Sequence, residues 1–356
     1  MSRWRDRLWP PASLCLLVAL VAVIGSNGSS VVQRQTIEVL INVVLVVGVF
    51  VFVGNSGVLS FGQMSFMSIG AYTTALVTIP EVQKQFLLPH LPAFVSNTTL
   101  GAVPAALLAG AVAVVVGAFI AVPISRLGGL AASLAMFAVL VVVHEVAIHW
   151  DAVTRGSQTM LGVPATLTIW SALAWAAIVI AVAYAHKQSA SGLRLRATRE
   201  DEFAARAVGI SIPRERAISF LLSAFIIGVG GSLYAQFQGA FTPSAFYLHI
   251  TFLTLAMLVV GGQKTLTGAV AGAVIVSVLS FFFNSLEDGF STGPVSFGGR
   301  DGLSDTLLAG FILLALGLRR EGLFRRELPW PGSPCRRRTT TPNTTAADAE
   351  TEAEAH

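Results

Sequence analysis

Charged residues are scarce in this sequence. Only 12% of the 356 residues are Asp, Glu, Lys or Arg, whereas a soluble domain normally carries about 25%. Apolar residues make up 54% of the chain, and the mean hydropathy is +0.72. So few charges cannot cover a folded surface with groups that water solvates. The composition therefore excludes an ordinary soluble protein and indicates a chain embedded in a lipid bilayer.

Cysteines and the common motifs of enzymatic chemistry are also lacking. Two cysteines, Cys15 in an apolar segment and Cys335 in a polar one, exclude a disulfide framework. The sequence has no Gly-x-x-x-x-Gly-Lys-Ser/Thr loop for nucleotide phosphates, no His-Glu-x-x-His pattern, no cysteine cluster for a metal and no nucleophile elbow. We therefore expect no ATPase site, no metal and no cofactor bound by this chain, and no enzymatic activity.

Long apolar segments, in contrast, recur along most of the chain. A hydrocarbon core of about 30 Å needs roughly 20 helical residues. The segments predict an all-α polytopic membrane protein with about ten transmembrane or membrane-embedded helices. They lie at 12–25, 37–53, 58–79, 100–122, 130–148, 168–185, 217–236, 247–262, 268–283 and 304–318. Several are short, which is typical of tilted or broken helices buried among others.

Lysine and arginine are divided unequally between the loops. With ten crossings, nineteen of the 23 lie on the side of the N-terminus, and the other side holds only Arg34, Lys84, Arg155 and Arg300. Cytoplasmic loops carry such an excess, so we expect both termini in the cytoplasm. The first segment also resembles a signal peptide, but Gly25-Ser26-Asn27-Gly28 is not an Ala-x-Ala cleavage site, which favours its retention.

The chain divides into three predicted parts. Residues 1–11 form a cytoplasmic N-terminus, and 12–325 form one membrane domain with a large cytoplasmic loop at 186–216. Residues 326–356 form a cytoplasmic tail rich in Thr, Ala and Glu. This tail cannot bury enough apolar surface to fold alone, so we expect it to be disordered.

The large loop contains a predicted helix from Thr198 to Val208. Its apolar face would be formed by Phe203, Ala204, Ala207 and Val208. The residues left for water or a partner are Arg199, Glu200, Asp201 and Arg206. Gly209 is expected to end the helix, and Pro213 to prevent its continuation.

Part of this loop, Glu202 to Gly209, resembles the EAA loop of the permease subunits of ATP-binding-cassette importers. In that family a short cytoplasmic helix docks into a groove on the ATPase subunit. The two alanines and the final glycine match, whereas Glu202 stands one place early and Phe203 occupies the usual Glu position. The resemblance implies an ATPase-coupling role for Arg199, Glu200, Glu202, Ala204, Ala205 and Gly209.

A longer series of ordered motifs resembles branched-chain amino acid permeases of the LivH/LivM type over about residues 37–325. The motifs run from Gly54 to Tyr72, Arg194 to Ile210, Gly228 to Tyr234, Pro243 to Phe246 and Val259 to Ala273. The chain length and Leu127-Gly128-Gly129 favour the LivM type.

This resemblance implies the membrane subunit of a bacterial importer. Its implied partners are a second homologous permease, two cytoplasmic ATPase subunits that use the ATP, and an external solute-binding protein. The solute-binding protein would dock near 149–167 or 237–246. The implied substrates are leucine, isoleucine and valine, while related permeases carry urea or short amides.

Small and polar residues within the apolar segments are candidates for a translocation path or for close helix packing, and the sequence leaves both open. Gly268 and Gly272 form a small-x-x-x-small face that lets helices approach closely. The full set of candidates is Gly57, Gly62, Gln63, Ser65, Gly70, Gly268 and Gly272.

A second interpretation is an ion- or proton-coupled secondary transporter of small polar solutes. An ionisable group in a membrane span is costly and therefore a functional candidate. Glu38, which shares a helix face with Asn42, or Glu145 beside His144 would then be the ion site. The competing explanation for these residues is structural pairing between helices.

Overall fold

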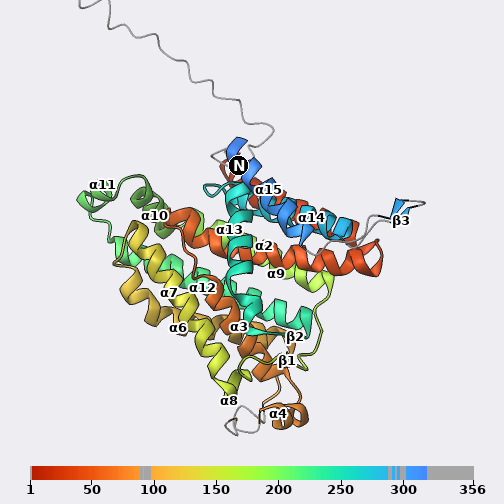
Figure 1. Ribbon diagram of the computed structural model, residues 1–356. Helices are drawn as coiled ribbons and strands as arrows, with labels where there is room; N and C mark the ends of the chain where they lie inside the picture. Colours follow the sequence, from red (N-terminus) through yellow and green to blue (C-terminus); the bar gives the residue numbers. More distant parts are fainter. Residues whose placement is uncertain are drawn as a thin grey trace, which may run out of the picture.

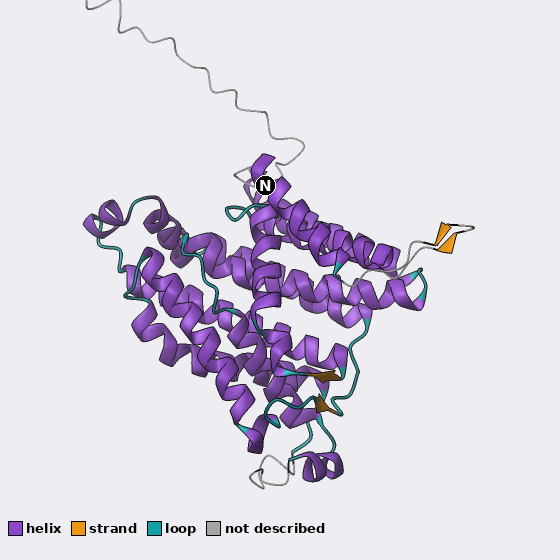
Figure 2. Ribbon diagram, viewed as in Figure 1, coloured by secondary structure: helices purple, strands orange, loops and turns teal. Residues whose placement is uncertain are grey.

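The computed structural model describes residues 2–88, 91, 98–287, 291–292, 295–296 and 302–318. These residues are almost entirely helical (Figure 2). The first helices are α1 (Ser2–Ser26), α2 (Ser30–Ser56), α3 (Met64–Thr78), α4 (Glu81–Leu87), α6 (Ala102–Ile124), α7 (Gly129–His149) and α8 (Asp151–Thr154). They are followed by α9 (Ile169–Gln188), α10 (Ala190–Glu200), α11 (Glu202–Ala207), α12 (Ile212–Gln238), the 3-10 helix η1 (Pro243–Phe246), α13 (Leu248–Gly261), α14 (Leu266–Glu287) and α15 (Leu303–Leu318).

Two short antiparallel ribbons complete the described fold. Strand β1 (Met160–Leu161) pairs with β2 (Ala240–Phe241), with Met160 opposite Phe241. Strand β3 (Ser291–Thr292) pairs with β4 (Val295–Ser296). The first ribbon joins the loop before α9 to the loop after α12, although these segments lie far apart in the sequence.

Seven helices of the described part are long and apolar enough to cross a membrane: α2, α6, α7, α9, α12, η1 with α13, and α14. The prediction of an all-α polytopic membrane protein is confirmed. The other three predicted segments fall on α1, whose apolar part is Pro11–Ser26, and on the short helices α3 and α15. The count of ten crossings therefore stays a prediction, as does the cytoplasmic location of residues 1–11. The predicted tail, 326–356, lies outside the described residues.

The predicted helix over 58–79 is wrong in its first turns, because α3 begins only at Met64. Helix α2 ends at Gly57, whose φ of 74° suits a residue without a side chain. The next residues are held by α7 instead of by helical hydrogen bonds: Ser133 Oγ donates to the Leu59 carbonyl oxygen at 2.6 Å. Irregular backbone at membrane depth is tolerated where protein surrounds it in this way.

Helices α2 and α12 form the centre of the bundle, with 83% of the α2 span buried but only 28% of the α7 span. Glycines permit this packing. A side chain at Gly70 of α3 would overlap the carbonyl oxygen of Gly228 in α12, and one at Gly231 would overlap the carbonyl oxygen of Met67. Close backbone approach of this kind is the usual basis of helix association in membranes.

The bundle has two structurally different ends (Figure 1). We call the first the α10–α11 end, where these two helices lie beside the C-terminal end of α2. We call the second the α4–α8 end, which carries α4, α8 and the β1–β2 ribbon at the bottom of the view. Arg34, in the second turn of α2, donates from Nη2 to Oε1 of Gln238 at the end of α12, at 3.4 Å. The start of α2 and the end of α12 therefore meet, on the side away from α10 and α11.

Candidate functional site

The predicted helix from Thr198 to Val208 is two helices, because the chain bends at Asp201. The backbone there is extended (φ −154°, ψ 112°), and α10 ends while α11 begins. The Asp201 carboxylate accepts hydrogen bonds from the backbone N–H groups of Phe203 at 2.8 Å and Ala204 at 3.0 Å. Aspartate caps a helix N-terminus well for this reason, so the residue assigned to the polar face instead divides the segment.

Gly209 ends α11 as expected. Its φ of 82° lies in the left-handed region that favours glycine. The N–H of Ile210 donates to the Ala205 carbonyl oxygen at 3.1 Å, and that of Gly209 donates to Arg206 at 3.0 Å. These bonds satisfy the last carbonyls of the helix, so α11 is a short helix capped at both ends.

The exposed surface of α11 is mainly apolar, with Arg206 as an exposed charge. Phe203 is 85% exposed and Val208 76% exposed, and Ala204 and Ala207 also face outward. Ala205, in contrast, is buried against the protein. It therefore supports α11 from behind, and the surface that a partner could contact is formed by Phe203, Ala204, Ala207 and Val208.

Arg199 joins α10 to the end of α2. Its Nη1 donates to the carbonyl oxygen of Gly54 at 2.6 Å, and its side chain lies where any side chain at Gly57 would have to be. The last carbonyls of a helix have no partner within the helix, and an arginine supplies one here. The same guanidinium binds Glu200 at 2.9 Å, and this hydrogen bond and charge lower the pKa of the Glu200 carboxyl.

Two buried charges in the first turn of α12 hold α10 and α11 in place. Arg216 forms an ion pair with Glu202 of α11 and donates to the Leu127 carbonyl oxygen at 3.1 Å. Glu215 accepts a hydrogen bond from Ser191 and pairs with Arg194 at 3.3 Å. Arg216 and Glu215 were not predicted as functional residues, although an adjacent acid and base at the start of an apolar span is a recognisable signal.

A third link connects α10 to α9. Lys187 is buried, with its ammonium 5.8 Å from the centre of the Phe50 ring, and its carbonyl oxygen accepts a hydrogen bond from Arg196 Nη2 at 3.1 Å. Burial, reinforced by the neighbouring charge of Arg199, lowers the pKa of Arg196. Helices α2, α9 and α12 are therefore all attached to the segment 190–207.

The other candidate residues lie at helix crossings or at the start of α3. Gly62 faces the backbone of Met136 in α7, at a distance that excludes a side chain. Gly268 and Gly272 of α14 lie against Gly261 of α13 in the same way. These glycines, together with Gly70, serve close helix packing. They do not gather at one site.

Gln63 and Ser65 occupy the discontinuity between α2 and α3. Both are buried, and Gln63 Oε1 lies 3.3 Å from the hydroxyl of Ser223 in α12. Among the described residues, neither the Gln63 Nε2 nor the Ser65 Oγ has a hydrogen-bond partner. Buried polar atoms are normally satisfied, so this region has unused capacity to bind a polar group.

Glu38 and Asn42 line one polar cavity of about 40 Å³ between α2, α13 and α14, as their shared helix face suggested. Asn42 Nδ2 donates to Ser277 Oγ at 3.1 Å.

The other ionisable candidates lie at the end of α7. His144 stacks on Tyr247 with ring centroids 3.9 Å apart, and exposed Glu145 pairs with His149 at 3.4 Å. Within the described ranges, no group of three His, Cys, Asp or Glu side chains is placed to hold a metal.

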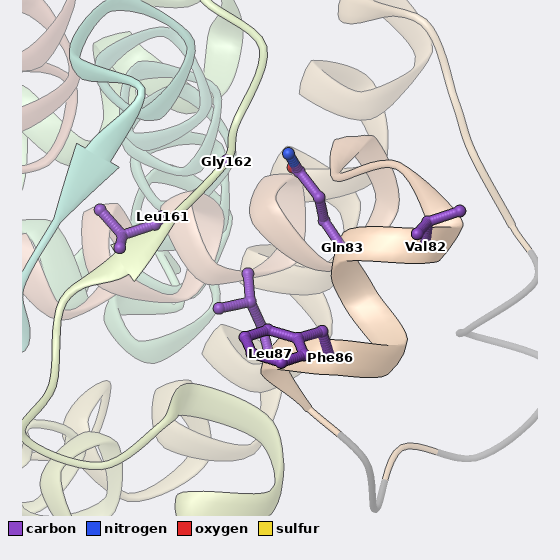
Figure 3. A pocket seen from close by; sticks show the side chains of 6 residues that line it. All are labelled: Val82, Gln83, Phe86, Leu87, Leu161 and Gly162. Atoms are coloured by element: carbon purple, nitrogen blue, oxygen red, sulfur yellow. The ribbon is translucent and has the colours of Figure 1, made fainter.

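The α4–α8 end contains an apolar cavity of about 430 Å³ between α4 and β1 (Figure 3). Phe86 and Leu87 of α4 lie on one side of it and Leu161 of β1 on the other. Val82 and Phe86 are 82% and 88% exposed, so α4 presents two large apolar side chains at this end.

The class of protein now follows from comparison with known families. The sequence profile of the family described as "Branched-chain amino acid transport system / permease component" matches residues 34–315. Because the match covers most of the chain, the chain belongs to this family. It is a multi-pass transport subunit of a bacterial inner-membrane complex and not an enzyme.

Individual relatives narrow the comparison. The chain is 26% identical to the high-affinity branched-chain amino acid transport system permease protein LivM of Salmonella typhimurium, over 92% of this chain and 77% of the relative. It is 25% identical to the Escherichia coli LivM protein, over 88% and 75%. A probable LivH permease of Methanocaldococcus jannaschii is 32% identical over only 30% of this chain and 34% of its own length. No solved structure gives a significant match.

Proposed function

We propose that this chain is a LivM-type subunit of an ATP-binding-cassette importer and forms the translocation path for branched-chain amino acids. Urea and short amides are the related small solutes that the same path would suit. Family membership supports the transport class, and the names of the two LivM relatives support the substrate. The chain itself binds no cofactor, and separate subunits bind and hydrolyse ATP.

The coupling role of the α10–α11 segment rests on one observation. Exposed apolar Phe203 and Val208 are carried on a capped helix that buried Arg216 attaches to a central span. An ATPase subunit that bound this helix would move α2 and α12 with it, because Arg199 and Arg216 connect the helix to both. Arg199, Glu200, Glu202, Ala204 and Gly209 form this segment, and Ala205 packs beneath it.

The complex would contain a second homologous permease, two ATPase subunits and an external solute-binding protein. With ten crossings, the α10–α11 end and both termini lie in the cytoplasm. The solute-binding protein then docks at the α4–α8 end, where 149–167 and 237–246 meet through the β1–β2 ribbon.

Co-purification with ATPase subunits tests the docking role. We expect Phe203→Ser to reduce recovery of the ATPase about tenfold, since a buried aromatic anchor is worth a few kcal/mol in an interface. Phe86→Ser is the matched control, because Phe86 is equally exposed but lies at the opposite end. Equal recovery with both variants would remove α11 from the interface.

The alternative function is an ion- or proton-coupled transporter, and the polar cavity around Glu38 favours it. A secondary transporter works without ATPase subunits. The purified chain alone would then accumulate solute in response to a proton or sodium gradient, which the importer proposal does not allow.

A further inference from the structure

A second cavity, of about 320 Å³, lies between α3, α6 and α7 and extends to α8. Its walls are mainly the aliphatic side chains of Val116, Val143 and Ala147, with Trp150 beside α8. Its polar lining comes mostly from α3, through Ser68 and Tyr72. An apolar cavity of a few hundred Å³ with a few polar groups is the usual form of a small-molecule site.

The α3 side of this cavity leads towards the discontinuity between α2 and α3. Ser65, Ser68, Tyr72 and Leu76 are spaced three or four residues apart, which places them on one face of the helix. The last three line the cavity. Ser65 therefore lies one turn beyond it, at the buried start of α3.

This face of α3 carries polar atoms that the protein leaves unused. Among the described residues, the Tyr72 hydroxyl and the Ser65 Oγ are buried without hydrogen-bond partners. Removing a polar atom from water without a new partner is unfavourable. A ligand with polar groups at this face would supply the missing partners.

Gln63 offers a further unused donor or acceptor, whichever way its side-chain amide is oriented. Ser223 has one hydroxyl proton, and its Oγ lies closer to the Gly48 carbonyl oxygen, at 2.7 Å, than to Gln63 Oε1, at 3.3 Å. If Ser223 donates to Gly48, then the Gln63 amide nitrogen faces Ser223 and its oxygen is left without a donor. One end of the amide is therefore free to bind a ligand.

We propose that this cavity is a substrate subsite that takes the aliphatic side chain of an α-amino acid. The Tyr72 hydroxyl and the polar start of α3 bind the charged end of the ligand. The inference rests on the proposed function and assigns that function a place in the chain. A lipid acyl chain fits the observations less well, because it offers no donor or acceptor to Tyr72 or Ser65.

The first test is Tyr72→Phe in the complete transporter reconstituted in liposomes. The Tyr72 ring packs against Phe241, with centroids 5.2 Å apart, and phenylalanine preserves this contact. Since the hydroxyl has no hydrogen-bond partner among the described residues, its removal should leave thermal stability unchanged. We expect maximal ATP-dependent leucine uptake to fall about tenfold, as for the loss of one hydrogen bond to a ligand.

The second test narrows the cavity. Val116→Phe fills it, whereas Val115→Phe adds the same ring one residue away, at a side chain that is 59% exposed on the outside of α6. We expect Val116→Phe to lower the ratio of maximal leucine to valine uptake about tenfold, because one methylene is discriminated by roughly this factor. Val115→Phe should leave the ratio unchanged. Val116→Ile, which adds a single methylene, replaces the phenylalanine variant if that variant does not fold.

The outcomes separate this inference from the function on which it rests. Absence of ATP-dependent leucine uptake by the wild-type complex contradicts the proposed function itself. Wild-type uptake, with Tyr72→Phe or the cavity-filling variant behaving like Val115→Phe, overturns only the subsite. Loss of a co-purified lipid from Val116→Phe, with an unchanged leucine to valine ratio, would overturn it too and identify the cavity as an acyl-chain site.

Discussion

At the α10–α11 end, charged side chains attach a loop to three spans, whereas at the α4–α8 end apolar side chains surround cavities. The first end uses the carbonyl of Gly54, the guanidinium of Arg216 and the carboxylate of Glu215. The second is joined by a two-residue ribbon, by Thr154, which donates to the Ala147 carbonyl oxygen at 2.7 Å, and by one buried charge, Lys84, which donates to the Thr98 carbonyl oxygen at 2.6 Å.

This difference suggests that the α10–α11 end transmits movement and that the α4–α8 end accommodates the solute. Buried ion pairs with good hydrogen bonds fix geometry, because breaking one leaves a charge without a partner. Such links can pass a displacement from α11 to α2 and α12. Apolar contacts are non-directional, so the α4–α8 end can open around a solute while the other end keeps its arrangement.

The largest loss of folded protein is expected at the crossing of α3 and α12, because this crossing lies between the two ends. Gly70→Val places a side chain on the Gly228 carbonyl oxygen, and overpacking of this kind costs about 1–3 kcal/mol or more. We expect little folded protein in detergent, measured by size-exclusion chromatography. Gly310→Val, in α15 with open space around it, should express normally. Equal yields would contradict the close crossing.

Breaking the α10–α11 end directly should have the next largest effect. Arg216→Met removes one of the two arginine partners of Glu202 and the donor to the Leu127 carbonyl oxygen, at a cost of about 2 kcal/mol. We expect a lower thermal transition temperature and faster proteolysis within 190–207. Arg206→Met removes an exposed i,i+4 partner of Glu202 and should cost less than about 1 kcal/mol. Similar losses for both would show that Arg216 is not a special anchor.

Arg199→Met should affect coupling more than stability. The substitution removes the bond to the Gly54 carbonyl but keeps much of the apolar stem beside Gly57. We expect the number of solute molecules taken up per ATP hydrolysed to fall about tenfold, in line with the loss of one charged hydrogen bond. Arg126→Met, an exposed arginine of the α6–α7 loop, is the control. An unchanged ratio for Arg199→Met would mean that movement does not pass through α2.

The smallest effect is expected at Glu38. In an ATP-driven importer its polar cavity only joins α2 to α13 and α14, so Glu38→Gln should leave ATP-dependent uptake within about twofold of wild type. An ion-coupled transporter with Glu38 as its ion site would lose transport altogether. Uptake assays in liposomes, with and without a proton gradient, distinguish these results.

The positions and ends of the helices could largely be predicted, because they depend on local composition. The features that depend on contacts between distant residues could not. Apolar segments placed the helices, and Gly209 ended α11, because these signals are local. The break before Met64 was not predicted, although Ser60, Gly62 and Gln63 interrupt the apolar run, because the path of 58–63 depends on contacts with Ser133 and Met136 of α7.

The candidate site was predicted less completely for the same reason. The segment was located from its charges and glycine, but Asp201 was placed on a helix face when it caps the second helix. The contact of Arg199 with Gly54 depends on α2, which lies far away in the sequence, and the burial of Ala205 depends on how α11 packs against the rest of the protein.

The most direct test of the whole account compares two sets of liposomes loaded with ATP. One set contains this chain alone, and the other contains it with the second permease and the ATPase subunits, both supplied with the solute-binding protein and labelled leucine. We predict ATP-dependent leucine accumulation only in the second set, with α11 protected from protease there. Gradient-driven accumulation by the chain alone would contradict the account.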